Sequence, residues 1–388
     1  MISTRNESDV LEAVRAARAH HRTLEIVGAG TKRVFGRVAP CDDVLDVSAL
    51  SGVVKYEPSE LILTVLPGTP VSEINALLSE KNQRLGFEPA DWGPLLGAAA
   101  NKDTIGGVLS ADTNGSTSLR YGRARDSLLG FRAVNGFGEV YKAGGKVVKN
   151  VTGFDLPKLM CGAMGTLGVL TEVTLRVFPK PPRQAVLVVR DVLPEEGFAI
   201  LRRVWQSPLE ATGLSYLPAS VPLRSLGYVG EGVALIRLEG ADEPLKEKIA
   251  ALRTIAPAAQ QIDAPEIFSS IANGDVFLTQ DCDVWRVFIP PTEAAHIVGA
   301  AAPQFWQADM AGGVLWIGLP PESDGVRLRE ACEEAGGHAV LLRASEETRN
   351  RVAVFARETK PRMALTKAVK AAFDPLGLFN PGRMWKGV

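Results

Sequence analysis

The stretch Leu24-Glu-Ile-Val-Gly28-Ala-Gly-Thr-Lys32 joins a short apolar strand to a glycine-rich turn, and it is the first indication of the fold. Glycines let the backbone adopt positive φ and approach a ligand closely. Successive exposed N–H groups in such a turn form a concave anion site that suits a pyrophosphate, and Lys32 and Arg33 add positive charge nearby. A Rossmann fingerprint would need a third glycine where Arg33 stands. Taken alone, a strand followed by such a turn is more often structural than functional.

Further groups of turn-forming residues follow along the chain. Pro67-Gly68 ends a strand, and Thr104-Ile-Gly106-Gly107 would let a flat ligand pass close over the backbone. Hydrogen-bonding groups for the heteroatoms of a ring edge are offered by Ser110, Thr113 and Asn114-Gly115. Gly165-Thr-Leu-Gly168-Val169 feeds a strand. Read singly, these groups are also typical of satisfied turns or of a helix-to-strand connection.

The N-terminal half alternates helical and strand-like patterns. Apolar periodicity predicts a helix over 8–20, capped by Ser8, and a second helix that starts at Thr69. The stretch 86–126 is too long and too rich in Gly, Asn, Asp, Ser and Thr for an ordinary surface loop, which indicates a ligand-lining role. Strands are predicted at 24–27, 44–47, 61–66, 128–135, 139–142 and 169–178, where Val169, Thr171, Val173, Leu175 and Val177 share one face.

A domain boundary is expected at Pro179-Lys-Pro181-Pro182, because three prolines in four residues cannot continue a sheet. Beyond it, residues 184–345 alternate strand-like and helix-like pieces, an α+β pattern with a sheet of moderate size. Strands are predicted at 185–189, 233–238, 284–289, 314–317 and 339–342, and helices at 194–206, 241–253, 292–302 and 322–335. A last helix is predicted over about 361–373 and is halted by Asp374-Pro375.

Charge and cysteine content exclude several classes of protein. The chain has 388 residues with 43 basic and 44 acidic side chains, so no global positive field recruits nucleic acid or anionic lipid. No signal-like apolar core follows Met1, and no apolar run reaches the ~18 residues of a membrane span. We therefore expect a cytoplasmic protein that would meet a membrane only through a partner. The four cysteines, Cys41, Cys161, Cys282 and Cys332, are too scattered for a disulfide framework or an iron–sulfur site.

Together, these turns carry a family resemblance. Gly28–Thr31, Pro67-Gly68, Ile105–Gly107 and Gly165–Val169 occur in an order and spacing similar to those of the FAD-binding domain of the vanillyl-alcohol oxidase and p-cresol methylhydroxylase (PCMH) family. The ending Phe373-Asp-Pro-Leu-Gly-Leu-Phe-Asn380-Pro-Gly-Arg-Met384 is similar to the closing segment of that family. Gly145-Lys-Val-Val-Lys-Asn-Val-Thr-Gly-Phe-Asp-Leu-Pro-Lys-Leu159 resembles the glycolate oxidase subunits, and the short length favours the FAD-binding subunit over the larger catalytic one. The likeness covers about residues 1–180 and 365–388.

The resemblance implies an α+β fold: a PCMH-type FAD-binding domain of two subdomains over 1–180, a cap domain with an antiparallel sheet over 184–345, and a segment 361–388 that returns to the FAD domain. The pyrophosphate would lie on residues 28–32, the segment 104–115 beside the pyrophosphate and isoalloxazine, and 165–169 near the adenine. The implied FAD-binding residues are Gly28, Ala29, Gly30, Thr31, Lys32, Pro67, Gly68, Thr104, Gly106, Gly107, Ser110, Asn114, Gly115, Gly165, Gly168, Val169 and Asn380.

Three departures from the family pattern matter. Asp112 stands where the family often has Asn, and an ionised carboxylate close to the flavin would lower its potential. The first glycine-rich turn has no His or Cys, which predicts non-covalent FAD. The metal-binding His-x-Gly-Asp-Gly-Asn motif of related hydroxy-acid dehydrogenases is absent, and no metal is expected. The chain's histidines are His20, His21, His296 and His338, which we interpret as surface or structural residues.

Oxidation of a small 2-hydroxy acid needs a base, a cation for the carboxylate and a flavin that accepts hydride. Arg286, Arg343 and Arg383 are available cations whose default reading is solvent-facing charge, and no residue stands out as the base. The resemblance therefore implies a subunit that aids electron transfer or assembly beside a larger FAD-containing catalytic subunit and an iron–sulfur subunit. One alternative is a self-sufficient FAD-dependent 2-hydroxy acid dehydrogenase, and another is a cofactor-free scaffold subunit.

Overall fold

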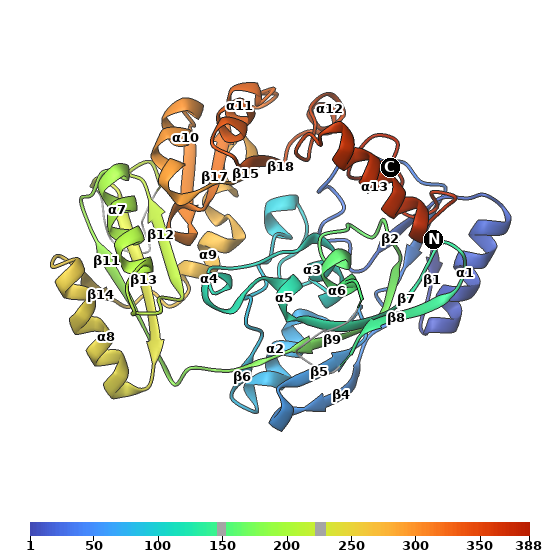
Figure 1. The fold of residues 1–388 in the computed structure, drawn as a ribbon, viewed down its shortest axis with the longest axis horizontal. Coiled ribbons are helices and arrows are strands. Elements are labelled where there is room, and N and C mark those ends of the chain that lie inside the picture. The colour runs from blue at the N-terminus through green and yellow to red at the C-terminus, as the bar shows by residue number, and fades with distance from the viewer. Residues whose placement is uncertain (146–152, 222–229) are drawn as a thin grey trace. The chain divides into compact units, whose positions relative to one another are not determined.

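The computed structural model describes residues 1–145, 153–221 and 230–388 (Figure 1). The chain folds into two compact units. The first unit contains residues 1–114, 122–180 and 357–388, and the second contains residues 115–121 and 181–356. Most of the stretch that resembles the glycolate oxidase subunits, residues 146–152, lies outside the described residues.

A small parallel sheet stands at the N-terminal side of the first unit. Its strands β1 (Ile2–Ser3), β3 (Asp43–Asp46) and β2 (Leu24–Val27) pair in that order. The helix α1 (Glu7–Ala19) packs its buried side chains, among them Val10 and Val14, against this sheet. Asn6 caps α1 by accepting from the N–H of Asp9, so the expected cap at Ser8 is wrong: Ser8 already lies in the first helical turn.

A five-stranded antiparallel sheet forms the other layer of the first unit, in the order β4 (Val53–Glu57), β5 (Ile62–Val65), β9 (Val169–Arg176), β7 (Leu128–Val134) and β8 (Val140–Gly144) (Figure 1). The central strand β9 bonds to β5 and β7. Leu170 and Thr174, on the face opposite to Val169, are buried as well, so the predicted alternation has two covered faces rather than one.

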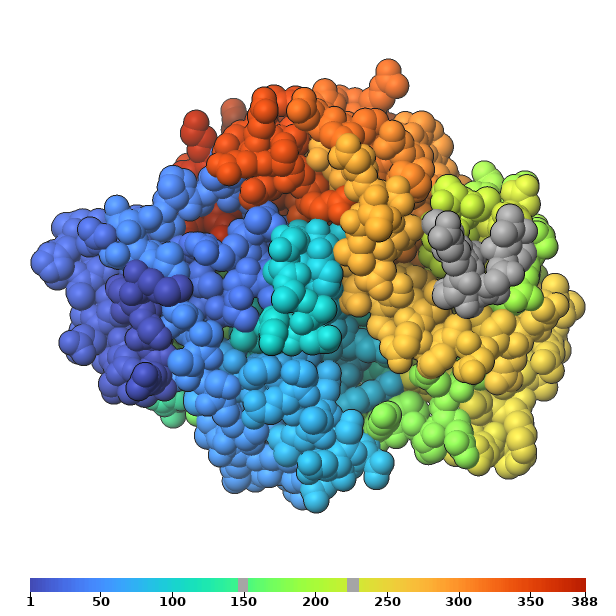
Figure 2. All heavy atoms as spheres, turned by 180° about the vertical axis from the view of Figure 1, so that it is seen from behind, coloured from blue at the N-terminus to red at the C-terminus, as the bar shows by residue number. Residues whose placement is uncertain are grey.

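Helices and short pieces complete the first unit. They are η1 (Pro58–Glu60), α2 (Val71–Ser79), η2 (Pro94–Leu96), α3 (Ile105–Ala111), α5 (Ala124–Ser127), α6 (Leu156–Met160), α13 (Lys360–Phe373) and the strand pair β6 (Gln83–Arg84) and β10 (Phe178–Pro179). The stretch 86–126 is thus irregular with short helices, and its residues 99–102 are exposed. Part of this stretch, drawn in cyan, reaches the surface shown in Figure 2.

The second unit is built on one eight-stranded antiparallel sheet, larger than expected. Its strands run in the order β14 (Gln260–Ile262), β11 (Arg183–Val189), β13 (Val233–Gly240), β12 (Gly213–Leu217), β16 (Phe305–Asp309), β17 (Val314–Leu319), β15 (Asp283–Phe288) and β18 (His338–Arg343). Its other elements are α4 (Ser118–Tyr121), α7 (Pro194–Trp205), α8 (Asp242–Ile255), α9 (Ile267–Asn273), η4 (Asp275–Phe277), η5 (Pro291–Glu293), α10 (Ala294–Ala301), η6 (Met310–Gly312), α11 (Val326–Glu334) and α12 (Glu346–Arg351). Within the described residues, no helix has the length and apolar character needed to cross a membrane.

Candidate functional site

A cleft in the first unit begins where β2 ends. It gathers residues from six separate parts of the chain: β2 with the turn after it, Val47, the bend at Pro67, α3 with its N-cap, the turn into β9, and the C-terminal residues Asn380 and Arg383. The predicted site residues that line it are Gly28, Ala29, Gly30, Thr31, Lys32, Pro67, Thr104, Gly106, Gly107, Ser110, Gly165, Gly168 and Asn380. The glycine-rich turns that are far apart in the sequence therefore share one continuous cleft.

The turn after β2 offers unpaired backbone donors. Among the described residues, no protein acceptor takes the N–H groups of Ala29, Gly30, Thr31 and Lys32. Ala29 is exposed and Gly30 half-buried, whereas Thr31 and Lys32 are buried, where N–H groups are almost always satisfied in folded proteins. Four successive donors on the wall of a cleft are consistent with the concave anion site expected from the sequence, which stays a prediction.

Glycine is required where the walls of this cleft meet. A Cβ on Gly28 would lie 2.6 Å from Oγ1 of Thr104, and one on Gly106 would lie 2.7 Å from Cβ of Pro67. The N–H of Gly106 donates to the carbonyl of Pro67 at 2.8 Å, so α3 begins directly against that bend. Side chains at these positions would force the walls apart, and their absence keeps the backbone open to a ligand.

Lys32 does not supply free positive charge, which corrects the expectation from the sequence. Its Nζ lies 2.5 Å from Oδ1 of Asp103, the same oxygen that accepts from the hydroxyl of Thr31 at 2.5 Å. The Lys32 and Asp103 side chains are only 8% and 6% exposed. Burial lowers the pKa of Lys32, against the opposing attraction of Asp103. The backbone donors, rather than the Lys32 ammonium, are therefore the candidate anion-binding groups of this turn.

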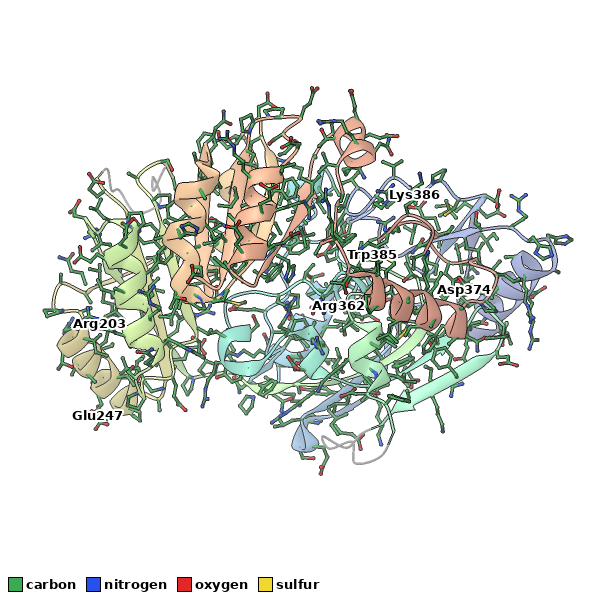
Figure 3. All side chains as sticks on the ribbon, turned by 45° about the horizontal axis from the view of Figure 1, so that its top comes forward. Arg203, Glu247, Arg362, Asp374, Trp385 and Lys386 are labelled. Carbon is green, nitrogen blue, oxygen red and sulfur yellow. The ribbon has the colours of Figure 1, made fainter. Side chains whose placement is uncertain are left out.

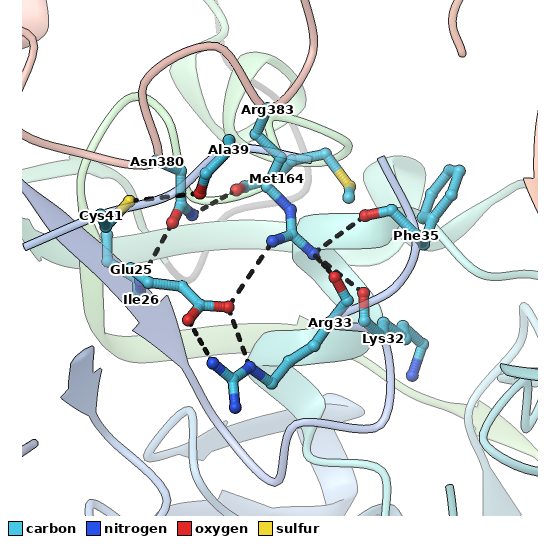
Figure 4. A network of polar contacts seen from close by, with 10 residues as sticks. All are labelled: Glu25, Ile26, Lys32, Arg33, Phe35, Ala39, Cys41, Met164, Asn380 and Arg383. Carbon is cyan, nitrogen blue, oxygen red and sulfur yellow. Dashed lines mark hydrogen bonds and ion pairs between the residues drawn. The ribbon is translucent and has the colours of Figure 1, made fainter. Parts of the chain in front are cut away.

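Arg33 and Arg383 are also paired with carboxylate. Both oxygens of Glu25 bind the guanidinium of Arg33, with a distance of 2.9 Å from Nε to Oε1, and this pairing raises the pKa of Arg33. Arg383 lies 3.8 Å from Oε1 of Glu25 and donates through Nη2 to the carbonyls of Lys32, Arg33 and Phe35 at 2.9, 3.0 and 2.9 Å (Figure 4). The reading of Arg383 as solvent-facing charge is wrong, because its side chain is 12% exposed.

Four predicted site residues do not line the cleft. Gly68 packs against the backbone at 47–50 and donates to the carbonyl of Leu50, which is a structural turn. Asn114 is buried and bonds to Asp112 and to the N–H of Ala124. The remaining two are Gly115, which belongs to the second unit, and Val169, which lies in the core of the first unit.

Other sequence candidates have structural partners. Asp112 ends α3 and pairs with Arg123 at 2.6 Å, so its charge is compensated. In the second unit, Arg343 donates to three main-chain carbonyls, and Arg286 is 5% exposed with its guanidinium over the rings of Phe288 and Trp316. Neither arginine is the solvent-facing cation expected by default. The four histidines are exposed, and His338 stacks on the ring of Phe288.

Sequence reasoning missed several residues of the cleft wall. Glu25 lies on β2, where strand alternation alone marks it as a surface position. Met164 has a φ of 52°, a conformation that a sequence motif does not reveal for methionine. Asn380, which was predicted, lines the cleft while its amide is bonded to the protein: Oδ1 accepts from the N–H of Ile26 at 3.1 Å and Nδ2 donates to the carbonyl of Met164 at 2.7 Å.

Comparison with known proteins places this geometry in a family. Residues 1–144 match the family model described as an FAD binding domain. The glycolate oxidase subunit GlcE of Escherichia coli is 30% identical over 97% of this chain and 96% of its own length. The chain belongs to the glycolate oxidase subunit family of FAD-binding proteins. It is an FAD-dependent oxidoreductase, and the unpaired donors and bare glycine backbone of the cleft fit a dinucleotide of this kind.

Two further relatives bear on the fold. The glycolate oxidase subunit GlcD of Bacillus subtilis is 23% identical over 99% of this chain and 88% of its own length. The structure of p-cresol methylhydroxylase with substrate bound superposes with a TM-score of 0.73 at 14% identity and covers 99% of this chain and 88% of that one. This confirms the predicted α+β, PCMH-type fold.

Proposed function

We propose that the cleft of the first unit holds FAD non-covalently, with its pyrophosphate on the N–H groups of residues 29–32. These four donors, which have no acceptor among the described residues, are the observation that carries the proposal. Among the described residues that line the cleft there is neither a histidine nor a cysteine, the usual attachment points for a covalent flavin. FAD bound there would supply hydride and electron transfer, and the protein supplies binding and orientation.

We further propose that the chain works as the FAD-binding subunit of a glycolate-oxidising complex. The match to GlcE extends over nearly the whole of both chains, so it includes the second unit as well as the cofactor unit. The partners would be a larger FAD-containing catalytic subunit and an iron–sulfur subunit, because the four scattered cysteines of this chain offer no cluster of their own. Its flavin would aid electron transfer or assembly rather than perform most of the oxidation of glycolate to glyoxylate.

A spectrum of the purified chain tests the first proposal. Oxidised flavin absorbs near ~450 nm, and precipitation with acid should release it into solution if it is non-covalent. No flavin band after incubation with excess FAD would reject binding in this cleft and would favour a cofactor-free scaffold.

Glycolate-dependent dye reduction tests the second. The isolated chain should hold flavin and turn over glycolate slowly or not at all, and activity should appear when the larger subunit and the iron–sulfur subunit are added. High turnover by the chain alone would contradict an auxiliary role and would show a self-sufficient 2-hydroxy acid dehydrogenase.

A further inference from the structure

The C-terminal segment 378–383 runs along the first unit beside the turn that follows β2. The N–H of Leu24 donates to the carbonyl of Leu378 at 2.7 Å, and the N–H of Asn380 donates to the carbonyl of Leu24 at 3.0 Å. Leu24 and Phe379 pair as in a parallel sheet. The segment therefore pairs with the start of β2, the strand that leads into the glycine-rich turn.

Arg383 reaches from this segment to the turn itself. One guanidinium nitrogen, Nη2, donates to the carbonyls of Lys32, Arg33 and Phe35, and the main-chain carbonyl of Arg383 accepts from the N–H of Arg37 at 2.8 Å. Residues 350 positions apart in the sequence are joined in this way. The Lys32 carbonyl belongs to the peptide directly after the last of the four unpaired N–H groups, and the carbonyls of Arg33 and Phe35 lie further along the chain. Arg383 therefore holds the backbone at the C-terminal end of the turn, next to the donors.

Close packing shows that this contact is built into the turn. Gly36 has a φ of 105°, and a Cβ on it would lie 3.1 Å from both Cγ and the carbonyl oxygen of Arg383. Arg383 shares the single carboxylate of Glu25 with Arg33. An arginine engaged by three carbonyls and a carboxylate is fixed as part of the protein framework.

Asn380 makes the second connection of the segment. Its amide bridges Ile26 on β2 and Met164 in the turn before β9, which are the two chain segments that carry Gly28 and Gly165 (Figure 4). A Cβ on Gly165 would lie 2.7 Å from Nδ2 of Asn380, so this glycine is needed to admit the amide. One side chain thus sets the spacing between two walls of the cleft.

A buried ion pair anchors the segment. Lys370 on α13 donates to Oδ2 of Asp374 at 2.7 Å, to the carbonyl of Thr166 at 2.7 Å and to the carbonyl of Phe379 at 2.9 Å. Asp374, at the end of α13 (Figure 3), accepts from the N–H groups of Leu378 and Phe379 at 2.9 and 2.8 Å. These contacts fix the start of the segment against the turn before β9.

From these contacts we infer that Arg383 and Asn380 are positioning residues: they form a C-terminal clasp that holds the glycine-rich turn ready for the FAD pyrophosphate before FAD arrives. The inference rests on the proposed function, since it concerns the same cleft. Glycine-rich backbone has many conformations, and ordering it during binding weakens affinity. A turn already fixed by the clasp avoids that cost. Arg383 itself lines the cleft, and the clasp attributes its effect to the carbonyls of the turn that it holds, which amide exchange in the apo chain distinguishes from contact with phosphate.

The test compares Arg383→Gln and Arg383→Lys in the full chain. Lysine keeps the positive charge but cannot reproduce the planar fork that reaches several carbonyls. Loss of charge-assisted hydrogen bonds should raise the Kd for FAD by about ten- to a hundred-fold in both variants. The matched control is Arg362→Gln on α13, exposed at 77% and labelled in Figure 3, which should stay within about twofold of the unchanged chain.

A second measurement tests the clasp without FAD. Hydrogen–deuterium exchange in the apo chain should show faster exchange of the amides of Arg33, Phe35 and Arg37 in both Arg383 variants but not in Arg362→Gln, because these amides are bonded within the turn or to Arg383. Recovery of FAD affinity by Arg383→Lys, or unchanged exchange in both variants, would overturn the clasp. If the unchanged chain binds no FAD, the proposed function fails, while the exchange reading still decides on the clasp.

Folding is checked by far-UV circular dichroism and Tm. If Arg383→Gln does not fold, Asn380→Ser replaces it, because serine is too short to bridge Ile26 and Met164. That variant should weaken FAD binding by about tenfold and should speed exchange at the two segments it joined. Unchanged affinity and exchange in Asn380→Ser would overturn the clasp as well.

Discussion

In the first unit, the turn at 29–32 leaves four N–H groups without an acceptor among the described residues, whereas in the second unit both oxygens of the Asp309 carboxylate accept hydrogen bonds from the protein. Asp309 takes the hydroxyls of Ser116 and Ser215 at 2.7 and 2.8 Å and the N–H of Met310 at 2.8 Å. Unfilled donors on a cleft wall indicate a place for a ligand, and a buried charge with its partners supplied by the chain indicates architecture.

Buried charged side chains and unpaired main-chain N–H groups both suggest a functional site, but in this chain only the N–H groups lack a protein partner among the described residues. Lys32, Lys370 and Asp309 are all buried and carry shifted pKa values, yet their contacts are with the protein. The groups that remain for a cofactor include the main-chain N–H groups beside glycines. In this chain, the positions where side chains are missing are therefore more informative about binding than the positions where charges are buried.

Lys370→Met should give the largest effect, because it leaves Asp374 buried and uncompensated. Removal of one partner of a buried ion pair costs about 3–5 kcal/mol of the free energy of unfolding. Urea denaturation of the unchanged chain and of Lys370→Met measures this loss. Lys367→Met, on the exposed side of α13, is the control. A loss below about 1 kcal/mol, the size typical of exposed pairs, would show that the pair contributes no more than a surface contact.

Asp309→Ala tests how much a buried carboxylate contributes to the stability of the second unit. The substitution deprives two buried hydroxyls and one N–H of their acceptor, and we expect a loss of about 2–3 kcal/mol. Asp281→Ala, at an exposed position, should stay within about 0.5 kcal/mol. If both variants have equal stability, the claim that buried charge in the second unit is architectural is wrong.

A matched pair of glycine substitutions compares the units directly. Gly106→Ala places a Cβ 2.7 Å from Pro67, so we expect about 1–3 kcal/mol of destabilisation together with weaker FAD binding. Gly299→Ala in α10 meets nothing within 4 Å and should stabilise by up to about 1 kcal/mol. Tm reports the stability of both variants, and titration with FAD reports their affinity for the cofactor. A tolerated Gly106→Ala with normal FAD affinity would remove the close-approach argument for the cleft.

Sequence predicted the strand and turn at 24–32 because alternation and glycine spacing are local properties. The strands β12, β14 and β16 of the sheet in the second unit were missed. Gly213, Gln307 and Asp309 interrupt the apolar runs of β12 and β16, and burial of these residues comes from neighbouring strands of the sheet. Their presence enlarges the sheet beyond the size expected from the sequence.

The turns that gather at the cleft were also predicted, but the state of its charges was not. From the sequence, Lys32 is expected to bind phosphate, but in the structure it pairs with Asp103, which is distant in the sequence. Arg383 reads as a surface cation, and its role depends on a contact across 350 positions of sequence. Local pattern shows where side chains are absent, whereas the partner of a charge is decided by tertiary packing.

Asp283 provides the smallest and most selective test, because it is a shifted carboxyl in the second unit. Burial raises its pKa from 3.8 to about 6, although the main-chain N–H groups of Glu322 and Ser323 and the charge of Arg343 oppose the shift. The native state then binds more protons than the unfolded state between pH ~4 and ~6, so stability falls as pH rises through that window. The full cost of the buried charge is present above about pH 6.

Asp283→Asn removes that charge while keeping one acceptor oxygen for the main-chain donors. We expect it to stabilise the protein by about 1 kcal/mol at pH 7.5 and to have almost no effect at pH 4, where the native carboxyl is already protonated. Urea unfolding at the two pH values measures the difference. A functional carboxyl would instead lose activity with no pH-dependent gain in stability, and a destabilised variant at pH 7.5 would show that the attraction of Arg343 outweighs the cost of burial.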